Sequence, residues 1–468
     1  MKHSEAKSRT SGNRIEHDSL GELEIPFDAL YGIHAVRARQ NFRISDVPVS
    51  DFPELIRALA MVKKAAAFTN QRLGVLPADK ADAIAAACED LIEGQHHDHF
   101  IVDMIQGGAG TSTNMNANEV IANLALKRLG RDLGDYGNLH PNDDVNKSQS
   151  TNDVYPTALR LAILLNMEVF SFEHRRLAEA FEGKAIAFDA ISKIGRTQLQ
   201  DAVPMTLGQE FRSFSRTIEE DVERLKDVSR LLLEVNLGGT AIGTSVNVPD
   251  QYTAMAVAQL AQISGFPFVS ASNLVEASSD LGAFVAFSGI LKRIAVKLSK
   301  ICNDLRLLSS GPRSGIGEIR LPAVQAGSSI MPGKVNPVIP EVVNQVAYQV
   351  IGNDLSVTLA AEAGQLQLNA MEPVAIYNIL QSMRLLKRAM ATLTDRCVLG
   401  IEADQQRCQA LLENSLAMAA ALVPRLGYDM SAEAAKYALK ENISLLEALV
   451  ALGVDPKSYD GILLQPHQ

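Results

Sequence analysis

The stretch FSGILKRIAVKLSKICNDL, residues 287–305, carries its apolar side chains at intervals of three or four residues. This spacing gathers them on one face of an α-helix. Residues 376–393 repeat the pattern, and we expect further long helices at 153–182, 208–234 and 340–364. Single helices of this length bury their apolar faces only against one another, so the sequence predicts a central helical bundle.

The two flanks of this bundle have a different pattern. At about 150 residues per domain, a chain of 468 residues is expected to hold three domains. We predict an all-α fold with an elongated central helical bundle (149–403). A mixed, mainly helical N-terminal domain (14–148) and a small C-terminal helical domain (404–468) flank it. Residues 1–13 are polar and are expected to form a disordered tail rather than a signal peptide.

Charge and hydropathy argue against two kinds of partner. The net charge is −10 and no basic stripe stands out, so no nucleic-acid partner is expected. Residues 251–275 carry no formal charge, but Gln259, Gln262 and Pro267 interrupt them. A buried helix followed by a loop is therefore expected there, and no membrane span.

The cysteine pattern indicates a reducing compartment. The chain has only Cys88, Cys302, Cys397 and Cys408, and none of them forms a CxxC pair. Four cysteines in so long a chain do not make a disulfide framework. We expect reduced thiols and a cytoplasmic location.

The run GSSIMPGKVNP, residues 327–337, concentrates polar chemistry in one loop. It holds two hydroxyls, one ammonium, one carboxamide and two glycines among prolines. This set suits a site that grips a carboxylate and removes a weakly acidic proton beside it. A surface loop with helix caps is the alternative interpretation, and Lys334 alone is compatible with a solvated lysine.

Two other segments also place hydroxyls and amides just before a helical pattern. They are QGGAGTSTNMN (106–116) and HPNDDVNKSQSTND (140–153). Helix N-termini expose unpaired N–H groups and attract carboxylates. Ordinary capping also explains the first segment, whereas the second has more polar groups than one cap needs. A fourth segment, GRTQLQDAVPMT (195–206), is expected to be a loop between two bundle helices.

Together, these four segments resemble the signature regions of the aspartase/fumarase superfamily, and the similarity extends from about Arg14 through the C-terminal domain. Loop 327–337 has the form found in the fumarases and the ammonia-lyases. Segments 107–112 and 338–346 are similar to the ammonia-lyase versions. The resemblance implies an all-helical homotetramer with each active site assembled from three subunits, a small dicarboxylate substrate, no organic cofactor and no catalytic metal.

The resemblance also implies roles for individual residues. Ser328 corresponds to the general base that removes a proton from C3 of the substrate, with its alkoxide stabilised by backbone N–H groups and the Lys334 ammonium. The groups expected to bind the β-carboxylate of the aci-carboxylate intermediate are Thr111, Ser150, Thr151 and Ser329. Those expected to hold the α-carboxylate are Lys334, Asn336 and Thr197. Asn152 and Gln198 match positions near the amino group, and Met331 is also expected to contact substrate.

Gln198 occupies a position at which fumarases have a histidine, paired with a glutamate that corresponds to Glu341. Loss of hydroxide requires a proton donor, whereas ammonia leaves from an ammonium that already carries its proton. A neutral glutamine accepts a hydrogen bond from that ammonium without repelling it. The resemblance, which this glutamine supports, implies reversible elimination of ammonia from L-aspartate to give fumarate.

Three alternatives stay open at the level of sequence. One is a fumarate hydratase, and a second is a lyase that acts on an N-substituted aspartate. The third, of another class, is a non-catalytic helical binding protein on the same fold. The presence of Ser328, Lys334 and Asn336 together argues against the third.

Overall fold

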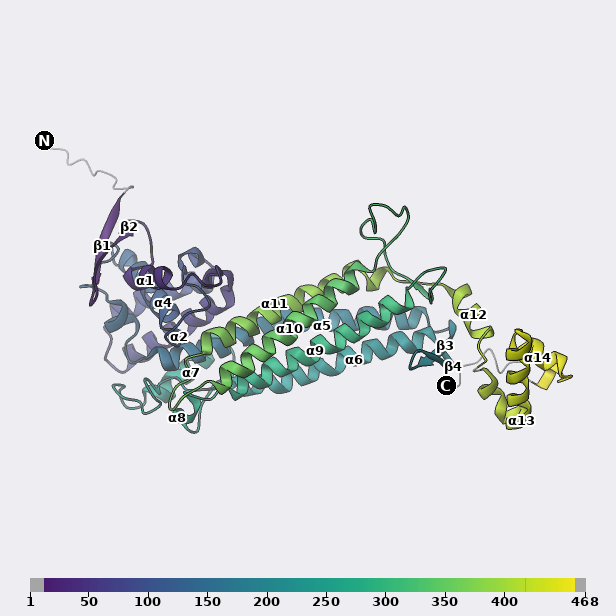
Figure 1. The fold of residues 1–468 in the computed structure, drawn as a ribbon. Helices are drawn as coiled ribbons and strands as arrows, with labels where there is room; N and C mark the ends of the chain where they lie inside the picture. Colours follow the sequence, from purple (N-terminus) through teal and green to yellow (C-terminus); the bar gives the residue numbers. More distant parts are fainter. Residues whose placement is uncertain (1–11, 417, 459–468) are drawn as a thin grey trace. The chain divides into compact units, whose positions relative to one another are not determined.

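The structure is a computed structural model that describes residues 12–416 and 418–458, and helices dominate it (Figure 1). The α-helices are α1 (Ile33–Asn41), α2 (Pro53–Arg72), α3 (Ala78–Ile92), α4 (Thr111–Arg128), α5 (Thr151–Ala187), α6 (Leu207–Ser229), α7 (Tyr252–Ser264), α8 (Leu274–Ala277), α9 (Gly282–Leu308), α10 (Val338–Glu362), α11 (Glu372–Arg396), α12 (Gln405–Glu413), α13 (Met418–Glu441) and α14 (Leu445–Ala451). The predicted all-α class is confirmed.

Strands are few and short. They are β1 (Asn13–Asp18), β2 (Gly21–Pro26), β3 (Ser192–Thr197), β4 (Gln200–Thr206), β5 (Glu234–Val235), β6 (Val269–Ser270), β7 (Ile319–Arg320) and β8 (Glu402–Ala403). They pair as β1–β2, β3–β4, β5–β6 and β7–β8, and only the β5–β6 pair is parallel.

The chain forms two compact units, each built from three segments. Among the described residues, unit 1 holds 12–170, 224–292 and 350–384, and unit 2 holds 171–223, 293–349, 385–416 and 418–458. Helices α5, α6, α9, α10 and α11 contribute residues to both units. The predicted domain limits at 13, 148 and 403 stay a prediction. Residues 1–11 of the expected tail and 459–468 of the expected C-terminal domain lie outside the described residues.

Unit 1 packs the N-terminal helices against one another. Helix α2 contacts α3 and α7, and α3 contacts α4. Helix α4 is buried on all sides from Thr113 to Leu126 although it carries several asparagines. In the same unit, the Ser288 hydroxyl and the Lys292 ammonium on α9 both donate to the Asp354 carboxylate on α10. Polar bonds thus hold the bundle segments of this unit in register.

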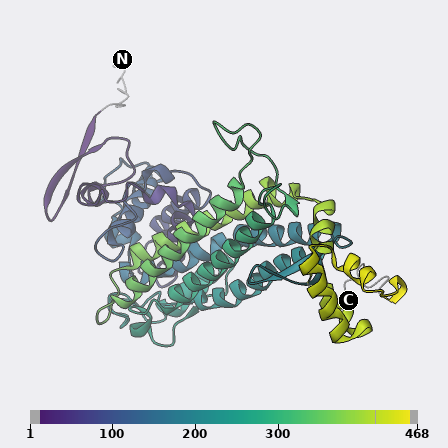
Figure 2. The same ribbon diagram turned by 45° about the vertical axis from the view of Figure 1, so that its right-hand side comes forward.

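Unit 2 contains the other halves of the long helices. The Ser215 hydroxyl on α6 donates to the carbonyl of Ala178 on α5, and Lys297 on α9 pairs with Asp221 on α6 at 2.9 Å. Both views show α6 and α9 side by side (Figure 1 and Figure 2). The C-terminal helices pack against the β3–β4 hairpin in an apolar cluster that includes Ile194 and Leu422.

The segment at 195–206 differs from the prediction. It is not an irregular loop but most of an antiparallel hairpin, in which Thr197 pairs with Gln200 and Ser192 with Thr206. The two turn residues, Gln198 and Leu199, have φ of 55° and 64°. These values match a tight two-residue hairpin turn. Such turns usually carry Asn-Gly or Asp-Gly, which this sequence lacks, so the turn residues did not indicate a hairpin.

The uncharged segment 251–275 was predicted as a buried helix and a loop. Helix α7 runs from Tyr252 to Ser264, and Tyr252 is fully buried. In the described part of the chain, no helix has both the length and the apolar character that crossing a bilayer requires.

Candidate active site

Thr111 stands at the first position of α4, behind a glycine that the local geometry requires. Gly110 has φ 85°, and a Cβ built there would lie 2.3 Å from the ring of Tyr155. Only glycine tolerates both conditions. The Thr111 hydroxyl donates to the carbonyl of Gly108 at 2.7 Å and is exposed.

Ser150, Thr151 and Asn152 form the start of α5. The backbone amide of Ser150 donates to Asp153 Oδ1 at 2.9 Å, and the amide of Asn152 donates to Ser150 Oγ at 3.2 Å. These two side chains therefore take up amides that the helix start would otherwise leave unpaired.

Asn114 links these two helix starts. It lies one turn into α4, and its Nδ2 donates to Thr151 Oγ1 at 3.0 Å. Unit 1 therefore brings the beginnings of α4 and α5 together. Thr111, Ser150, Thr151 and Asn152 all belong to this junction.

Asp153 fixes the start of α5 to the loop that follows β5. Its Oδ2 accepts hydrogen bonds from the backbone amides of Gly238 and Thr240 at 2.9 and 3.1 Å. Burial raises the pKa of Asp153 to about 6, although the amides of Ser150, Thr240 and Gly238 favour the charged form. Asn152 Nδ2 also donates to the carbonyl of Ala241 in this loop.

Thr197 and Gln198 lie at the tip of the β3–β4 hairpin in unit 2, and both are exposed. Two ion pairs with the buried Glu318 hold the first strand of this hairpin. Lys193 Nζ lies 2.6 Å from Glu318 Oε2, and Arg196 NH1 lies 2.8 Å from Glu318 Oε1. These ion pairs therefore fix the position of the hairpin that carries Thr197 and Gln198 at its tip.

The loop around Ser328, also in unit 2, closes on itself. The Gly327 amide donates to the carbonyl of Lys334 at 3.0 Å, and Asn336 Nδ2 donates to the carbonyl of Gly327 at 2.7 Å. A Cβ at Gly327 would lie 2.1 Å from that Lys334 oxygen, so the closure requires glycine. Ser329, Met331 and Lys334 are exposed on the loop, which leads into α10.

The hydroxyl of Ser328 faces two backbone donors. Its Oγ accepts hydrogen bonds from the amides of Ile330 and Met331, both at 3.1 Å. Donors aimed at an oxygen favour its negatively charged form. This arrangement fits a serine that works as a base.

The predicted site residues thus fall into three groups. The α4–α5 junction belongs to unit 1, whereas the hairpin tip and the Ser328 loop belong to unit 2. Each group has its own network of hydrogen bonds, as described above.

The sequence did not reveal the polar groups beneath the α4–α5 junction. Asn146 Oδ1 accepts hydrogen bonds from the buried Lys63 and from Asn114 and Asn118. A usable signal existed in the sequence. Asparagines recur at 114, 116, 118 and 123 in a helix that carries almost no charge before Lys127, a composition that suits a buried polar face better than a solvated one.

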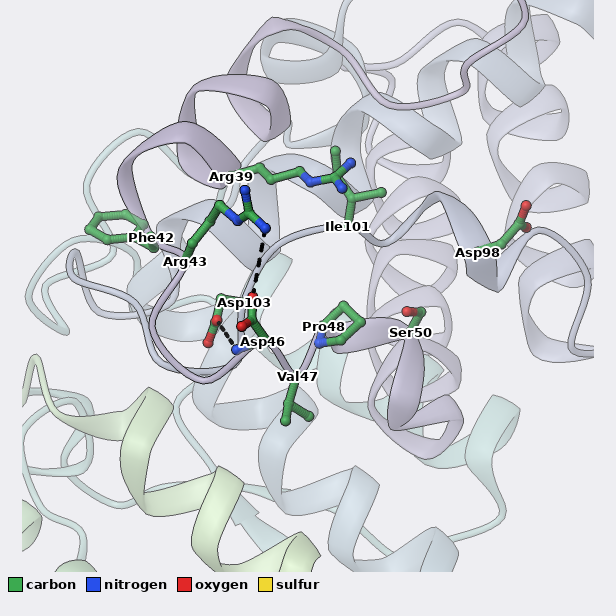
Figure 3. Close-up of a pocket in the computed structure, with 10 residues that line it drawn as sticks. All are labelled: Arg39, Phe42, Arg43, Asp46, Val47, Pro48, Ser50, Asp98, Ile101 and Asp103. Atoms are coloured by element: carbon green, nitrogen blue, oxygen red, sulfur yellow. Dashed lines mark hydrogen bonds and ion pairs between the residues drawn. The ribbon is translucent and has the colours of Figure 1, made fainter.

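A surface cavity of about 370 Å³ in unit 1 contains none of the predicted site residues (Figure 3). Arg39 and Arg43 line it together with Asp46 and Asp103. The Asp103 carboxylate is already engaged by the amides of Ile44, Ser45, Asp46 and Ile105. The Asp103 carboxylate therefore holds the local backbone in place.

The described residues were also compared with the side-chain clusters that bind metal ions. In residues 12–416 and 418–458, no three histidine, cysteine, aspartate or glutamate side chains gather as a ligand set for a metal ion.

Comparison with known proteins identifies the family of the chain. A family model described as "Lyase" matches residues 21–352, and one described as "Fumarase C C-terminus" matches residues 418–466. An aspartate ammonia-lyase of Pseudomonas aeruginosa is 60% identical over 94% of this chain and 93% of its own length. The aspartate ammonia-lyase of Escherichia coli is 52% identical over 94% of this chain and 92% of its own length.

Solved structures show the same fold. A fumarate lyase:delta crystallin from Brucella melitensis, bound to cobalt, has a TM-score of 0.95 and 62% identity, and covers 97% of this chain and 98% of its own. A class II fumarase from Schistosoma mansoni has a TM-score of 0.90 and 33% identity at the same coverage. These matches define the class of the protein as a lyase. The chain belongs to the aspartase/fumarase superfamily, as the four sequence segments predicted.

Proposed function

We propose that this lyase eliminates ammonia from L-aspartate to give fumarate, reversibly, with Ser328 as the general base. The observation that carries the proposal is the pair of amides, from Ile330 and Met331, that donate to Ser328 Oγ. Such preorganised donors lower the cost of forming an alkoxide at neutral pH. The relatives described above, at 52% and 60% identity, are named aspartate ammonia-lyases, which supports the same reaction here.

In the proposed reaction, Ser328 Oγ removes a proton from C3 of aspartate. The electron pair moves into the β-carboxyl group and gives an aci-carboxylate with two negative charges. It then returns to form the C2–C3 double bond while the C2–N bond breaks and ammonia leaves. The base and the leaving group act on opposite faces, so the elimination is anti.

The other predicted residues keep their expected roles in this proposal. The β-carboxylate is assigned to Thr111, Ser150, Thr151 and Ser329, and the α-carboxylate to Thr197, Lys334 and Asn336. Asn152 and Gln198 are assigned to the amino group, and Met331 to a further substrate contact. The exposed position of Gln198 at a hairpin tip supports a role in contacting a ligand.

We also propose a homotetramer with active sites shared between subunits. Helix α10 carries an exposed apolar stripe of Tyr348, Ile351, Leu355 and Leu359. Leu355 and Leu359 are 60% and 58% exposed. A contiguous apolar stripe on one helix is typical of a surface that another copy covers.

A cytoplasmic location is proposed from the cysteines. All four are free and buried, and burial raises the pKa of Cys88 to about 12. Thiols in this state are poor nucleophiles, which suits a protein that keeps them reduced.

The deciding experiment is a substrate panel with the purified full-length chain. Aspartate, malate and argininosuccinate are each supplied, fumarate is followed by its ultraviolet absorbance, and ammonia is measured in parallel. We expect equal amounts of fumarate and ammonia from aspartate. Faster fumarate formation from malate would indicate a hydratase. Fumarate formation from argininosuccinate alone would indicate a lyase for substituted aspartates. Absence of product from all three substrates would indicate a binding protein.

A further inference from the structure

A buried lysine lies beneath the α4–α5 junction and takes no part in the proposed chemistry. Lys63 is on α2, its side chain is fully buried, and its Nζ lies 2.7 Å from Asn146 Oδ1. Burying an ammonium is costly unless it is paired and hydrogen-bonded.

The ammonium determines which way the Asn146 amide faces. A protonated lysine donates hydrogen bonds and accepts none. The Asn146 oxygen must therefore point at Lys63, and its Nδ2 points the other way, donating to the carbonyl of Gln149 at 3.2 Å.

The position of the Asn146 oxygen in turn fixes the orientation of the Asn114 amide. The Asn146 oxygen accepts from Asn114 Nδ2 at 3.2 Å. If the Asn114 amide were reversed, two carboxamide oxygens would face each other. The second N–H of the same group donates to Thr151 Oγ1 at 3.0 Å.

The consequence for Thr151 concerns the direction of its hydroxyl proton. A threonine hydroxyl has one donor and two acceptor positions. Because the Asn114 amide occupies an acceptor position, the Thr151 proton has to point elsewhere. It is then free to donate to a ligand carboxylate.

We propose that Lys63 is a positioning residue that, through Asn146 and Asn114, keeps the Thr151 hydroxyl as a donor for the substrate β-carboxylate. This inference rests on the proposed function and on the assignment of Thr151 to the carboxylate. It adds a buried cation that acts through two asparagines without touching the substrate.

The charges around Lys63 fit this role. Burial lowers the pKa of Lys63 to about 7, while the Asp153 carboxylate on α5 acts in the opposite direction. The Asp153 carboxylate thus favours the ammonium form. A neutral amine would accept a hydrogen bond and release the constraint on Asn146.

The test compares Lys63→Met with wild type in the full-length protein. We expect KM for aspartate, and the Kd of the unreactive dicarboxylate succinate, to rise about tenfold, with kcat changed less than about threefold. In a Thr151→Val background, adding Lys63→Met should raise KM no further, since the donor is already gone. A general packing defect would add to the Thr151→Val effect instead.

Two further variants complete the design. Lys64→Met removes the neighbouring lysine, which pairs with Glu89 at the surface, and should leave KM unchanged. Asn114→Asp places an acceptor opposite Thr151, so it should raise KM even if Lys63→Met fails to fold.

Each result leads to a definite decision. If wild type is active and both Lys63→Met and Asn114→Asp keep the wild-type KM, the relay is wrong while the proposed function stands. Additive effects of Lys63→Met and Thr151→Val would also overturn the relay. An inactive wild-type protein would overturn the proposed function and this inference with it.

Discussion

Lys193 and Glu318 form a buried ion pair, with Nζ 2.6 Å from Oε2 and side chains that are 2% and 0% exposed. Arg196 reaches the other oxygen of the same carboxylate, and Lys193 also contacts Glu210 at 2.5 Å. Two cations of the β3–β4 hairpin therefore share the Glu318 carboxylate, which precedes β7. The hairpin that presents Thr197 and Gln198 is fixed by this group.

Removing that carboxylate should destabilise the protein strongly. Glu318→Leu leaves Lys193 buried with a single partner, and breaking a buried pair costs about 3–5 kcal/mol. Urea unfolding of the variant against wild type measures the loss. Glu402→Leu, an exposed position nearby in the fold, is the control and should change the free energy of unfolding by less than about 0.5 kcal/mol. Equal stability of the two variants would contradict the dependence on Glu318.

Replacing the proposed base should affect turnover and leave binding intact. Ser328→Ala removes the oxygen that accepts the Ile330 and Met331 amides. We expect kcat for aspartate to fall by a factor of about 10²–10⁴, with succinate affinity close to wild type. Ser213→Ala, on an exposed face of α6, should leave kcat unchanged. A Ser328→Ala enzyme with the full rate would place the base elsewhere.

The apolar stripe of α10 should control assembly. Leu355→Glu with Leu359→Glu puts two charges on a surface expected to be covered by another copy, where unpaired buried charges are costly. Light scattering should show wild type at four times 50.5 kDa and the double variant at a smaller mass. Activity should fall with the mass if subunits share active sites.

A matched change outside α10 makes this result specific. Leu439 on α13 is 72% exposed, and Leu439→Glu should retain the assembly and the activity. A wild-type protein that is monomeric at all concentrations would refute the proposed tetramer.

The buried carboxyl of Glu372 should give stability a defined pH dependence. Burial raises its pKa from 4.5 to about 8. Between these values the folded chain keeps the proton and the unfolded chain releases it, so this group's contribution to stability falls as pH rises. The contribution of this group to the free energy of unfolding falls by at most about 1.4 kcal/mol per pH unit.

Glu372→Gln removes this titration. The free energy of unfolding of wild type minus that of the variant should decrease from pH 4.5 to pH 8 and level off outside that window. Denaturant melts at several pH values measure it. Glu362→Gln, exposed at the end of α10, should show a difference that is flat with pH, and the same flat difference for Glu372→Gln would refute the prediction.

The long helices could be predicted from the sequence because their apolar spacing persists over many turns. Helix α5 was expected at 153–182 and runs from Thr151 to Ala187. Helix α6 was expected to reach 234 and ends at Ser229, before a short 3-10 helix over Arg230–Leu233. Periodicity determines where a helix exists better than where it stops, because its ends depend on local caps.

The β3–β4 hairpin could not be predicted in the same way. Two-residue hairpin turns with positive φ usually carry Asn-Gly or Asp-Gly, whereas here the turn is Gln198-Leu199. Both residues adopt a conformation that their side chains disfavour. The sequence therefore lacked the usual turn signal, and the pairing becomes visible only in three dimensions.

For the candidate site, the sequence predicted which residues carry the chemistry but not what orients them. Thr151 and Ser328 stood out by motif, yet Lys63 looked like any lysine of an amphipathic helix. Its partners Asn114 and Asn146 lie in segments far apart in sequence from it. Such contacts arise from packing, which neither motif nor periodicity describes.

The close approach of Gly110 to Tyr155 has a consequence for protein engineering. Residue 110 admits one amino acid of the twenty, because any Cβ there would enter the tyrosine ring. A mutagenesis library that seeks broader substrates by varying the start of α4 should leave this residue fixed and diversify the exposed positions of the hairpin tip instead. Library variants that replace Gly110 should be lost from such a selection, because they cannot form this start of α4.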